Sequence, residues 1–385
     1  MTDLTLTARV VDRIGAIAPD AWDACAGAEN PFVSHAFLQA LEASGSVGRG
    51  TGWLPQHLVL EDDGGRIHAA TPLYVKGHSQ GEYVFDHGWA EAYERAGGRY
   101  YPKLQIAVPF SPVPGPRLLV RADGDVAAIR SAMIDALTAT AERSGLSSLH
   151  VTFCERDEAM DMVDHGYLLR LGTQYHWSNE GYQSFDDFLG ALASRKRKAI
   201  RKERASVATT GIDIRALSGD EIKSAHWDAF FAFYLDTGGR KWGRPYLNRA
   251  FFEALHQTLR DKIVLVMAFR DGQPIAGALN LRGSEALFGR NWGCIEDVPY
   301  LHFECCYYQA IDYAIAHGLK RVEAGAQGEH KIQRGYLPVE TYSAHWIADD
   351  NFRAAVADYL DRERRVMQNE IAGLMTLSPF RKEND

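Results

Sequence analysis

The stretch PFVSHAFLQAL (31–41) decides the fold, because it returns later in the chain as PYLNRAFFEAL (245–255). The prolines, the alanines and the final leucines keep the same spacing in both stretches. Further matches follow in the same order: Trp22-Asp23-Ala24 with Trp227-Asp228-Ala229, Asp63-Gly64 with Asp271-Gly272, Gly145-Leu146 with Gly318-Leu319, and Gly166-Tyr167-Leu168 with Gly335-Tyr336-Leu337. An ordered repeat with so long a period predicts two homologous domains.

Length and composition agree with two domains. A chain of 385 residues is too long for one ordinary core and fits two domains of roughly 150 to 200 residues each. The net charge is −8, and no stretch approaches the ~20 consecutive apolar residues of a membrane span. The N-terminus, MTDLTLTARVV, has neither the basic region nor the apolar run of a signal peptide. We therefore expect a cytoplasmic protein.

The cysteines and acids do not predict a metal site or a disulfide framework. Five cysteines occur without C-x-x-C spacing, at positions 25, 154, 294, 305 and 306, so buried thiols are expected. Glu296, Asp297, His302 and Glu304 also match no standard metal-ligand spacing, and we assign them to the entry of a helix.

Each copy predicts the same order of elements: a helix that opens at Pro31 or Pro245, a β-hairpin, a crossover helix and a strand. In the second copy these are strands 263–270, 274–283 and 285–293, helix 303–317 and strand 319–323; in the first copy the crossover is helix 126–143 and strand 148–153. The pattern predicts an α/β (α+β) fold with mixed sheets. We expect domains at 1–178 and 179–349, and a C-terminal helix and tail at 350–385.

Between the copies lies a basic segment, SRKRKAIRKERA (194–205), in which seven of the ten residues from 195 to 204 are cations. One interpretation is a helix whose charged side chains are solvated and whose few apolar residues pack against the core. The other is a phosphate-binding helix that uses Arg197 and Arg201, suited to a pyrophosphate or a nucleic-acid backbone. Both remain open.

The two copies differ most after the final strand, where the first has CERDEAMDMVDHGYL (154–168) and the second EAGAQGEHKIQRGYL (323–337). The first is typical of a short amphipathic helix. The second places acids, an imidazole and cations among small residues that let a ligand approach the backbone: Glu323, Gln327, Glu329, His330, Lys331 and Arg334. We therefore expect the active site in the second copy, with Arg290 and Asn291 as further substrate-binding candidates. The alternative is a polar surface loop.

The first copy carries a long insertion, residues 77–117, rich in aromatic residues, proline and glycine. Its composition is typical of ordered loops and pocket walls, and Asp86, Trp89 and Lys103 are its candidate binding residues. Its GHSQG run (77–81) matches the G-x-S-x-G motif of serine hydrolases, with Ser79 as nucleophile. That motif requires a sharp turn from strand to helix, and the sequence that follows favours β-structure, so a hydrolase is a remote alternative.

Many of these segments together resemble the bacterial FemAB-like family of GNAT-type acyltransferases, which is associated with peptidoglycan biosynthesis. The resemblance rests on NPFVSHAF, GEYVFDHGWA, YYPKLQIAVPFSPVPGPRLL, SRKRKAIRKER, RKWGRPYL, LHFECCYYQAIDYAI, EAGAQGEHKIQRGYLPV and SPFRK, and covers nearly the whole chain. It implies two tandem acyl-CoA N-acyltransferase folds. By this likeness Arg197 and Arg201 contact phosphate, and Lys331 stabilises the oxyanion or the leaving group.

The resemblance implies a co-substrate that is not tightly bound, either acyl-CoA or an aminoacyl-tRNA, and a peptide-like or other small amine as acceptor. The segment GCIEDVPYLHF (293–303) lacks the Q/R-x-x-G-x-G/A pattern that grips coenzyme A, and no coiled-coil arm of the tRNA-handling kind is visible. The donor therefore stays open.

The sequence thus predicts an N-acyltransferase, in which Glu323, Glu329 or His330 accepts the proton of the amine and Lys331 and Arg334 hold negative charge. The alternative from another class is a non-catalytic protein that binds nucleic acid or a nucleotide-linked glycan through the basic segment. Positions kept in both copies, such as Trp22 and Trp227 or Trp177 and Trp346, are expected to serve packing.

Overall fold

The computed structural model describes residues 5–241, 245–326 and 328–381. The chain forms two compact units, each built from two separate stretches. Unit 1 comprises Met1–Gly172 and Glu340–Gln368, and unit 2 comprises Thr173–Val339 and Asn369–Asp385. This division differs from the expected continuous domains, because β9 (Leu168–Ser178) begins in unit 1 and ends in unit 2, and β15 (Leu337–Ile347) runs from unit 2 back into unit 1.

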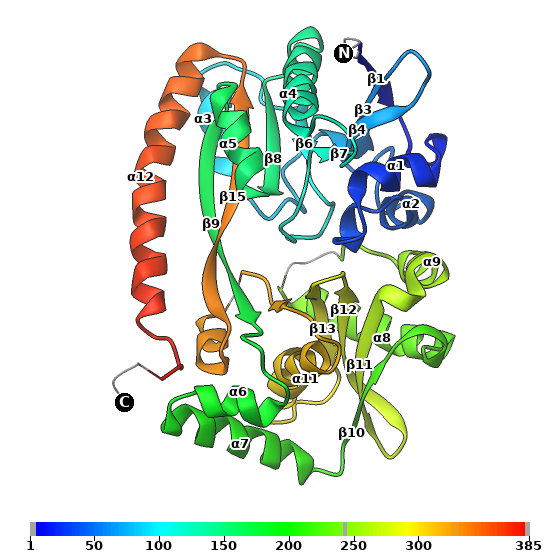
Figure 1. The fold of residues 1–385 in the computed structure, drawn as a ribbon, viewed down its shortest axis with the longest axis vertical. Helices are drawn as coiled ribbons and strands as arrows, with labels where there is room; N and C mark the ends of the chain where they lie inside the picture. Colours follow the sequence, from blue (N-terminus) through cyan, green and yellow to red (C-terminus); the bar gives the residue numbers. More distant parts are fainter. Residues whose placement is uncertain (1–4, 242–244, 327, 382–385) are drawn as a thin grey trace. The chain divides into compact units, whose positions relative to one another are not determined.

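Unit 1 contains most of the first copy and the end of the chain's last strand (Figure 1). Its elements are β1 (Thr7–Val11), η1 (Ile14–Ala16), α1 (Pro19–Ala26), η2 (Pro31–Val33), α2 (His35–Ala43), β2 (Trp53–Pro55), β3 (His57–Glu61), β4 (Ile67–Thr71), β5 (Leu73–Lys76), α3 (His87–Arg95), β6 (Lys103–Ile106), β7 (Leu119–Val120), α4 (Val126–Arg143), β8 (Ser148–Cys154), α5 (Arg156–Asp164) and most of α12 (Asp350–Met375). One sheet has the order β1-β3-β4-β7, and a second runs from β15 through β8, β6 and β5 to β2.

Unit 2 follows the same scheme. Its elements are α6 (Phe185–Ala191), α7 (Ser194–Ala208), β10 (Asp213–Leu217), η3 (Gly219–Glu221), α8 (Ser224–Lys241), α9 (Arg249–Leu259), η4 (Arg260–Lys262), β11 (Ile263–Arg270), β12 (Gln273–Arg282), β13 (Ala286–Cys294), α10 (Leu301–Phe303), the π-helical segment η5 (Glu304–Tyr308), α11 (Gln309–Ala316), β14 (Arg321–Glu323) and η6 (Glu329–Arg334). Strands β10 to β13 are antiparallel neighbours, and β14 joins β13 to β9.

A parallel strand pair with a helical crossover recurs in both units. In unit 1, β6 and β8 are parallel, and α4 lies between them in the chain. In unit 2, β13 and β14 are parallel, and the α10–η5–α11 segment lies between them. Parallel strands require such a crossover, and both crossovers are followed by the predicted glycine, Gly145 or Gly318, at positive φ. The duplication of the fold is therefore present in the structure.

The first helix of each copy begins later than the sequence predicted. Helix α2 starts at His35 and α9 at Arg249, four residues after the prolines that were expected to open them. In both copies a capping side chain sets the start: the Ser34 side chain accepts from the backbone N–H of Phe37, and the Asn248 side chain accepts from that of Phe251. The side-chain cap satisfies a backbone donor that the helix leaves open, so it sets the boundary more strongly than proline does.

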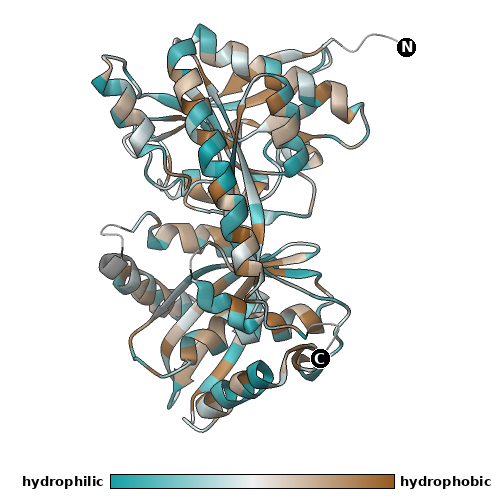
Figure 2. Cartoon of the chain, turned by 90° about the vertical axis from the view of Figure 1, so that its left-hand side faces the viewer, coloured by the Kyte–Doolittle hydropathy of each residue, from teal (hydrophilic) through white to brown (hydrophobic). Residues whose placement is uncertain are grey.

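Large tryptophans anchor the cores at matched positions. Trp22, Trp177 and Trp227 are fully buried and Trp346 is nearly so, as expected for packing residues. Figure 2 shows hydrophobic residues along the strands of each unit, while the α12 helix that faces the viewer is largely hydrophilic. Among the described residues, no helix combines the length and the apolar character that crossing a bilayer demands.

The matched caps give a stability prediction. Ser34→Ala and Asn248→Ala should each lower the free energy of unfolding by about 1 kcal/mol, because each removes the acceptor for one amide of the first helical turn. Chemical denaturation, followed by circular dichroism, measures this. Ser194→Ala is the control, since Ser194 is exposed and the N-cap of α7 makes no side-chain hydrogen bond. Equal stability of all three variants would contradict the assignment.

Candidate active site

A pocket of about 370 Å³ lies in unit 2 beside the parallel strand pair. Three parts of the second copy line it: strands β12 and β13, the start of the crossover helix, and the segment that follows β14. The lining residues are Ala278, Leu279, Asn280, Gly289, Arg290, Asn291, Trp292, His302, Cys306, Tyr307, Ala324, Gly328, His330 and Lys331. Four predicted site residues, Arg290, Asn291, His330 and Lys331, thus come together at one cavity.

A β-bulge directs Arg290 toward this region. In the β12–β13 ladder, Leu279 lies opposite Asn291 and Asn280 lies opposite Gly289, so Arg290 is the extra residue of β13. A bulge bends its strand locally and re-aims a side chain, and bulges are frequent beside active sites. The irregularity in the strand therefore accounts for the presence of a charged side chain on the pocket wall.

Lys331 is buried in η6, with 5% of its surface exposed. Its ammonium group donates to the backbone carbonyls of Ala324 and Gly325, the latter at 3.2 Å. Burial lowers the pKa of Lys331 to about 8. The side chain is therefore mostly protonated at neutral pH and loses its charge within about one pH unit above it.

The neighbouring His330 ring faces a tyrosine. Its Nε2 lies 3.0 Å from the hydroxyl oxygen of Tyr307, within hydrogen-bond distance. Burial and the nearby cations Arg334 and Lys331 lower the pKa of His330, so the ring is neutral at neutral pH. Gly328 has φ +101°, and a Cβ there would come within 2.4 Å of the His330 ring. Only glycine permits this approach of backbone to imidazole.

Arg334 holds the loop in place and does not line the pocket. Its guanidinium donates to Glu203 Oε1 and to the His330 carbonyl, both at 2.8 Å, and lies 3.4 Å from the ring centre of Phe303. Glu203 also accepts from the Tyr308 hydroxyl, so one carboxylate joins α7, η5 and η6. Arg334 was expected to hold negative charge of the substrate, whereas its charge is already balanced by Glu203.

The predicted acids lie apart from the pocket. Glu323 is buried on β14, where its carboxylate accepts from Arg321 Nε at 2.8 Å and lies 3.8 Å from His176 Nε2. Glu329 is exposed. Neither occurs among the described residues that line the cavity. Gln327, the remaining predicted residue of this segment, lies outside the described residues.

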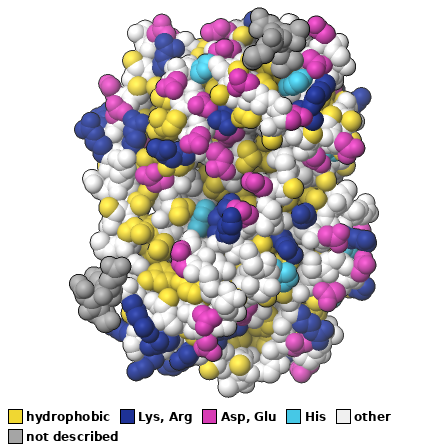
Figure 3. Space-filling model, viewed as in Figure 1, with side chains coloured by type: hydrophobic (Ala, Val, Ile, Leu, Met, Phe, Trp, Pro, Cys, Tyr) yellow, Lys and Arg dark blue, Asp and Glu magenta, His cyan; other side chains and the backbone are white. Residues whose placement is uncertain are grey.

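The basic segment forms helix α7, as predicted, and its cations divide between two roles. On the inner side, Arg204 pairs with Glu304 at 2.9 Å and with Asp312 at 2.7 Å. Arg201 is exposed and pairs with Asp186 at 2.9 Å, while Arg197 is half-buried. Figure 3 shows Lys and Arg side chains gathered at the lower left, over α7. Neither Arg197 nor Arg201 is among the described residues of the pocket wall.

Sequence reasoning missed the aromatic and thiol side of the pocket. Trp292, His302, Cys306 and Tyr307 all line it, and the His302 ring lies 5.2 Å from that of Trp292 and 5.4 Å from that of Tyr307. His302 and Cys306 are four residues apart on one helix, which is the signal that could have found them. The π-helical turn at Glu304–Tyr308 carries two of these residues, and such turns are frequent at functional sites.

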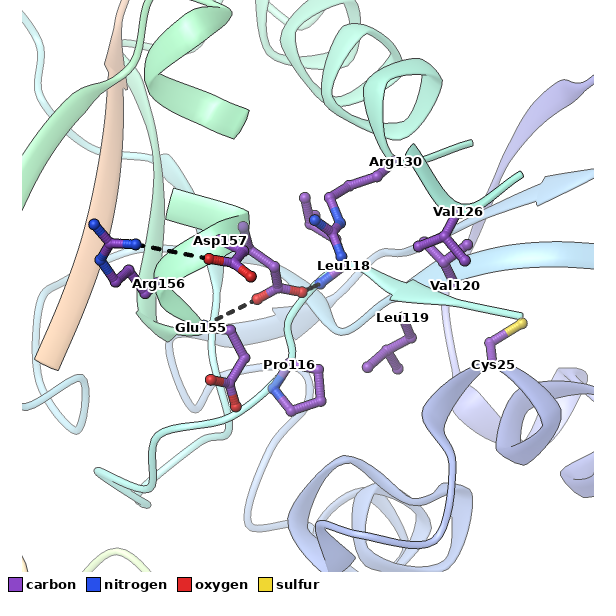
Figure 4. Close-up of a pocket in the computed structure, with 11 residues that line it drawn as sticks. Cys25, Pro116, Leu118, Leu119, Val120, Val126, Arg130, Glu155, Arg156 and Asp157 are labelled. Carbon is purple, nitrogen blue, oxygen red and sulfur yellow. Dashed lines mark hydrogen bonds and ion pairs between the residues drawn. The ribbon is translucent and has the colours of Figure 1, made fainter. Parts of the chain in front are cut away.

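Unit 1 has a pocket of about 360 Å³ at the matching place, beside β7, the start of α4 and the segment after β8 (Figure 4). In this pocket the carboxylate of Glu158 accepts hydrogen bonds from backbone N–H groups. Glu158 is buried and accepts from the N–H groups of Leu118 at 2.7 Å, Arg117 at 2.9 Å and Glu155 at 3.1 Å. Aligned on the shared Gly-Tyr-Leu, Lys331 corresponds to Met162, which is fully buried in the apolar core of unit 1.

Comparison with known proteins assigns the chain to a family. A family model described as peptidoglycan biosynthesis/recognition, FemAB-like, matches residues 13–382. The chain belongs to the FemAB-like family. No curated protein sequence matches it.

Solved structures agree with this assignment at the level of the fold. FemX is similar with a TM-score of 0.56 at 10% identity, covering 89% of this chain and 98% of FemX. The C-terminal domain of a putative lysylphosphatidylglycerol synthetase from Agrobacterium fabrum has a TM-score of 0.53 at 9% identity, covering 88% and 96%. L-PGS from Bacillus licheniformis has a TM-score of 0.52 at 11% identity, covering 87% and 98%. At such identities the likeness concerns the fold alone.

The candidate residues of the first-copy insertion form a buried network in unit 1 of this FemAB-like protein. Lys103 is fully buried and donates to Asp86, to Glu82 at 2.8 Å and to Ser79 at 2.9 Å. Burial alone would lower the pKa of Lys103, but the two carboxylates together raise it above its usual value. Trp89 is also buried, with its ring against His345. Lys103 and Asp86 are engaged with each other, and Trp89 packs against His345, so a structural role accounts for these side chains.

The hydrolase alternative does not fit the structure. Ser79 is 1% exposed, and its hydroxyl is engaged with Lys103 and with the Tyr101 hydroxyl at 2.8 Å. Strand β5 ends at Lys76 and α3 begins only at His87, so the sharp strand-to-helix turn of a nucleophile elbow is missing around Ser79. A protonated Lys103 also cannot accept the proton of the serine.

The buried network predicts a large stability effect. Lys103→Met should lower the free energy of unfolding by about 3–5 kcal/mol, because it leaves the buried Asp86 carboxylate without its lysine and Glu82 with only the more distant Lys76, at 3.7 Å. Arg201→Gln, which breaks an exposed pair, should change it by less than about 1 kcal/mol. Urea denaturation of both variants measures the difference. If Lys103→Met were as stable as Arg201→Gln, Lys103 would not be the centre of a buried ion-pair network.

Proposed function

We propose that this protein is an N-acyltransferase whose reaction takes place in the unit 2 pocket. The observation that carries the proposal is the buried, partly deprotonatable Lys331 beside His330 in a pocket next to the bulged strand β13. Membership of the FemAB-like family and the likeness of the fold to FemX support it. The acceptor is an amine, and the donor is an activated acyl ester or thioester, either an aminoacyl-tRNA or an acyl-CoA.

In this reaction the neutral amine nitrogen attacks the acyl carbonyl carbon, a new C–N bond forms, and the C–O or C–S bond to the donor breaks. The pocket must orient the two reactants, because orientation supplies much of the catalysis of such reactions. The charged Lys331 disfavours a protonated amine nearby, so it lowers the pKa of the acceptor and increases its nucleophilic fraction. The protonated Lys331 then stabilises the oxyanion of the tetrahedral intermediate.

His330 is the best-placed proton acceptor. It is the only one of the three predicted bases that occurs among the described pocket residues, and its lowered pKa keeps it neutral at neutral pH. The contact with the Tyr307 hydroxyl orients the ring. The proton lost by the attacking amine passes to His330, directly or through water, and can return to the leaving group.

The residue roles predict the following kinetics. With a mixture of amines and either acetyl-CoA or aminoacyl-tRNA, mass spectrometry should detect a new amide. Lys331→Met should lower kcat/KM about 100-fold and His330→Asn about 100-fold. The wild-type rate should fall as pH rises through about 8, since Lys331 is charged only below that pH, and Lys331→Met should lack this fall.

Glu329→Gln is the matched control, because Glu329 is an exposed neighbour on the same loop and should leave turnover within about twofold of wild type. Near-normal turnover of both Lys331→Met and His330→Asn would mean that the reaction takes place elsewhere.

A second candidate function is non-catalytic binding of nucleic acid or a nucleotide-linked glycan through α7. The exposed cations Arg195, Lys198, Arg201 and Lys202 favour it. The observation against it is that other cations of α7, such as Arg204, are paired with carboxylates of the fold. Binding of tRNA that weakens steeply with salt, without amide formation under any donor, would favour this second function.

A further inference from the structure

Tyr307 and His330 form a hydrogen-bonded pair at the wall of the unit 2 pocket. Both residues line the cavity, but the Tyr307 side chain is buried, with 4% of its surface exposed, whereas His330 is exposed. The hydroxyl oxygen of Tyr307 lies 3.0 Å from Nε2 of His330. The pair therefore connects a buried point of the pocket wall with an imidazole that solvent reaches.

The direction of this hydrogen bond follows from what each side chain can donate. Burial raises the pKa of Tyr307, so its hydroxyl keeps its proton at neutral pH. A buried hydroxyl needs an acceptor for that proton, and among the described residues His330 Nε2 is the group in hydrogen-bond contact with it. The Tyr307 hydroxyl therefore donates to Nε2, and the neutral His330 ring carries its own proton on Nδ1.

This arrangement covers the lone pair that has to receive a proton. An imidazole with its proton on Nδ1 accepts only at Nε2, and Nε2 faces the Tyr307 oxygen. The phenolic oxygen has lone pairs of its own, so it can accept one proton while it passes its own proton on. The two transfers are concerted, because the raised pKa of Tyr307 makes a phenolate too costly in this site.

The local structure fixes both members of the pair. Tyr307 belongs to the π-helical turn Glu304–Tyr308, and its backbone carbonyl accepts from the hydroxyl of the buried Tyr336 at 3.0 Å. The close approach of the Gly328 backbone restricts the ring of His330 from the other side. A hydroxyl and an imidazole held in this way are preorganised for proton transfer.

The matched positions of the first copy hold neither member of the pair. Counted back from the shared Gly-Leu, Tyr307 corresponds to Ile134, which is fully buried in an apolar core on the uninterrupted helix α4. Counted back from the shared Gly-Tyr-Leu, His330 corresponds to Asp161, which pairs with Arg130. The pair and the π-helical turn that carries it therefore belong to the copy that contains the candidate active site.

We infer that Tyr307 is a catalytic residue, which takes the proton of the attacking amine on its hydroxyl oxygen while its own proton passes to Nε2 of His330. This inference rests on the proposed function and specifies the route of its proton. As the C–N bond forms, the N–H bond of the amine breaks, and the exposed imidazolium of His330 then releases a proton to water. The oxygen or sulfur of the leaving group takes up a proton from water after its bond to the acyl carbon breaks, so the protons balance.

The tautomer of His330 tests the geometry without any acyl donor. In the full-length chain labelled with ¹⁵N-histidine, NMR at neutral pH should show the His330 proton on Nδ1, and His330→Asn assigns the resonance. Tyr307→Phe should shift the proton toward Nε2, because the hydrogen bond that selects the tautomer is lost. A wild-type ring with its proton on Nε2 would overturn the inference, since Nε2 would then have no lone pair for the transfer.

Turnover gives the second test. Tyr307→Phe should lower kcat about 100-fold and leave KM within about twofold of wild type, because it removes a proton-transfer group and keeps the shape of the side chain. The wild-type kcat should also fall as the pH falls through the lowered pKa of His330, since a protonated ring cannot accept, and Tyr307→Phe should lack this fall. Tyr313→Phe, a hydroxyl loss on α11 away from the described lining residues, should leave kcat within about twofold of wild type.

The double variant Tyr307→Phe/His330→Asn separates a shared step from two independent roles. It should be at most about threefold slower than the slower single variant, because two groups that act in one transfer have non-additive effects. Multiplied losses in the double variant, or a normal kcat of Tyr307→Phe, would overturn the inference.

The outcomes separate from those of the proposed function. Circular dichroism checks that each variant is folded, and the tautomer of the wild-type protein decides the geometry even if Tyr307→Phe is not. Absence of an amide with every donor would overturn the proposed function, whereas amide formation at the wild-type rate by Tyr307→Phe would overturn only the inference.

Discussion

The candidate site depends on one interaction that is unfavourable in free energy: the ammonium group of Lys331 is buried and loses its hydration. The lowering of its pKa from 10.5 to about 8 corresponds to a penalty of about 3 kcal/mol for the charged form. Two backbone carbonyls compensate part of it, and they can do so because Gly325 and Gly328 turn the segment after β14 at positive φ. The Arg334–Glu203 pair fixes the other end of the loop. The first copy avoids this penalty with Met162.

A destabilising charge in a pocket is a common mark of function, because stability alone would favour an apolar residue there. Because the fold is duplicated, the pocket of unit 2 can be compared with that of unit 1. Both copies keep the parallel strand pair and the crossover helix, and in each a pocket lies near the start of that helix and the segment that follows the last strand. They differ in the side chains at the pocket wall: Glu158 is bound to backbone amides in unit 1, and Lys331 and His330 line the cavity in unit 2.

The fold was largely predictable, because it depends on local patterns that occur twice. Asp271 and Gly272, both at positive φ, form the expected hairpin turn, and helix α4 has the predicted bounds. The helix starts at Ser34 and Asn248 were misjudged, because a side-chain cap outweighs a proline. The passage of β9 and β15 from one unit to the other was not predictable, since a continuous strand pattern does not reveal which unit each half of the strand joins.

The sequence alone identifies side chains that are chemically unusual for their position, but it does not show which partners the fold brings to them. His330 and Lys331 stand out chemically where the copies diverge, and the structure brings them together with Arg290 and Asn291 at one pocket. Glu323, Arg334 and Lys103 form ion pairs with Arg321, Glu203 and the carboxylates beside β6. Only the fold brings Glu203 to Arg334 and the carboxylates to Lys103, whereas Arg321 lies two residues before Glu323 on β14. Helix α7 similarly has both a structural inner side and an exposed basic side, which composition alone cannot separate.

The central claim is that Lys331 is buried, charged and poised in the pocket of the second copy. An NMR titration of the protein with ¹³C-labelled lysine, with Lys331→Met used to assign the resonance, measures its pKa directly. The account predicts a value of about 8, well below that of the exposed lysines. A value near 10.5 would contradict it, because Lys331 would then be a solvated side chain and the pocket would lack its central charge.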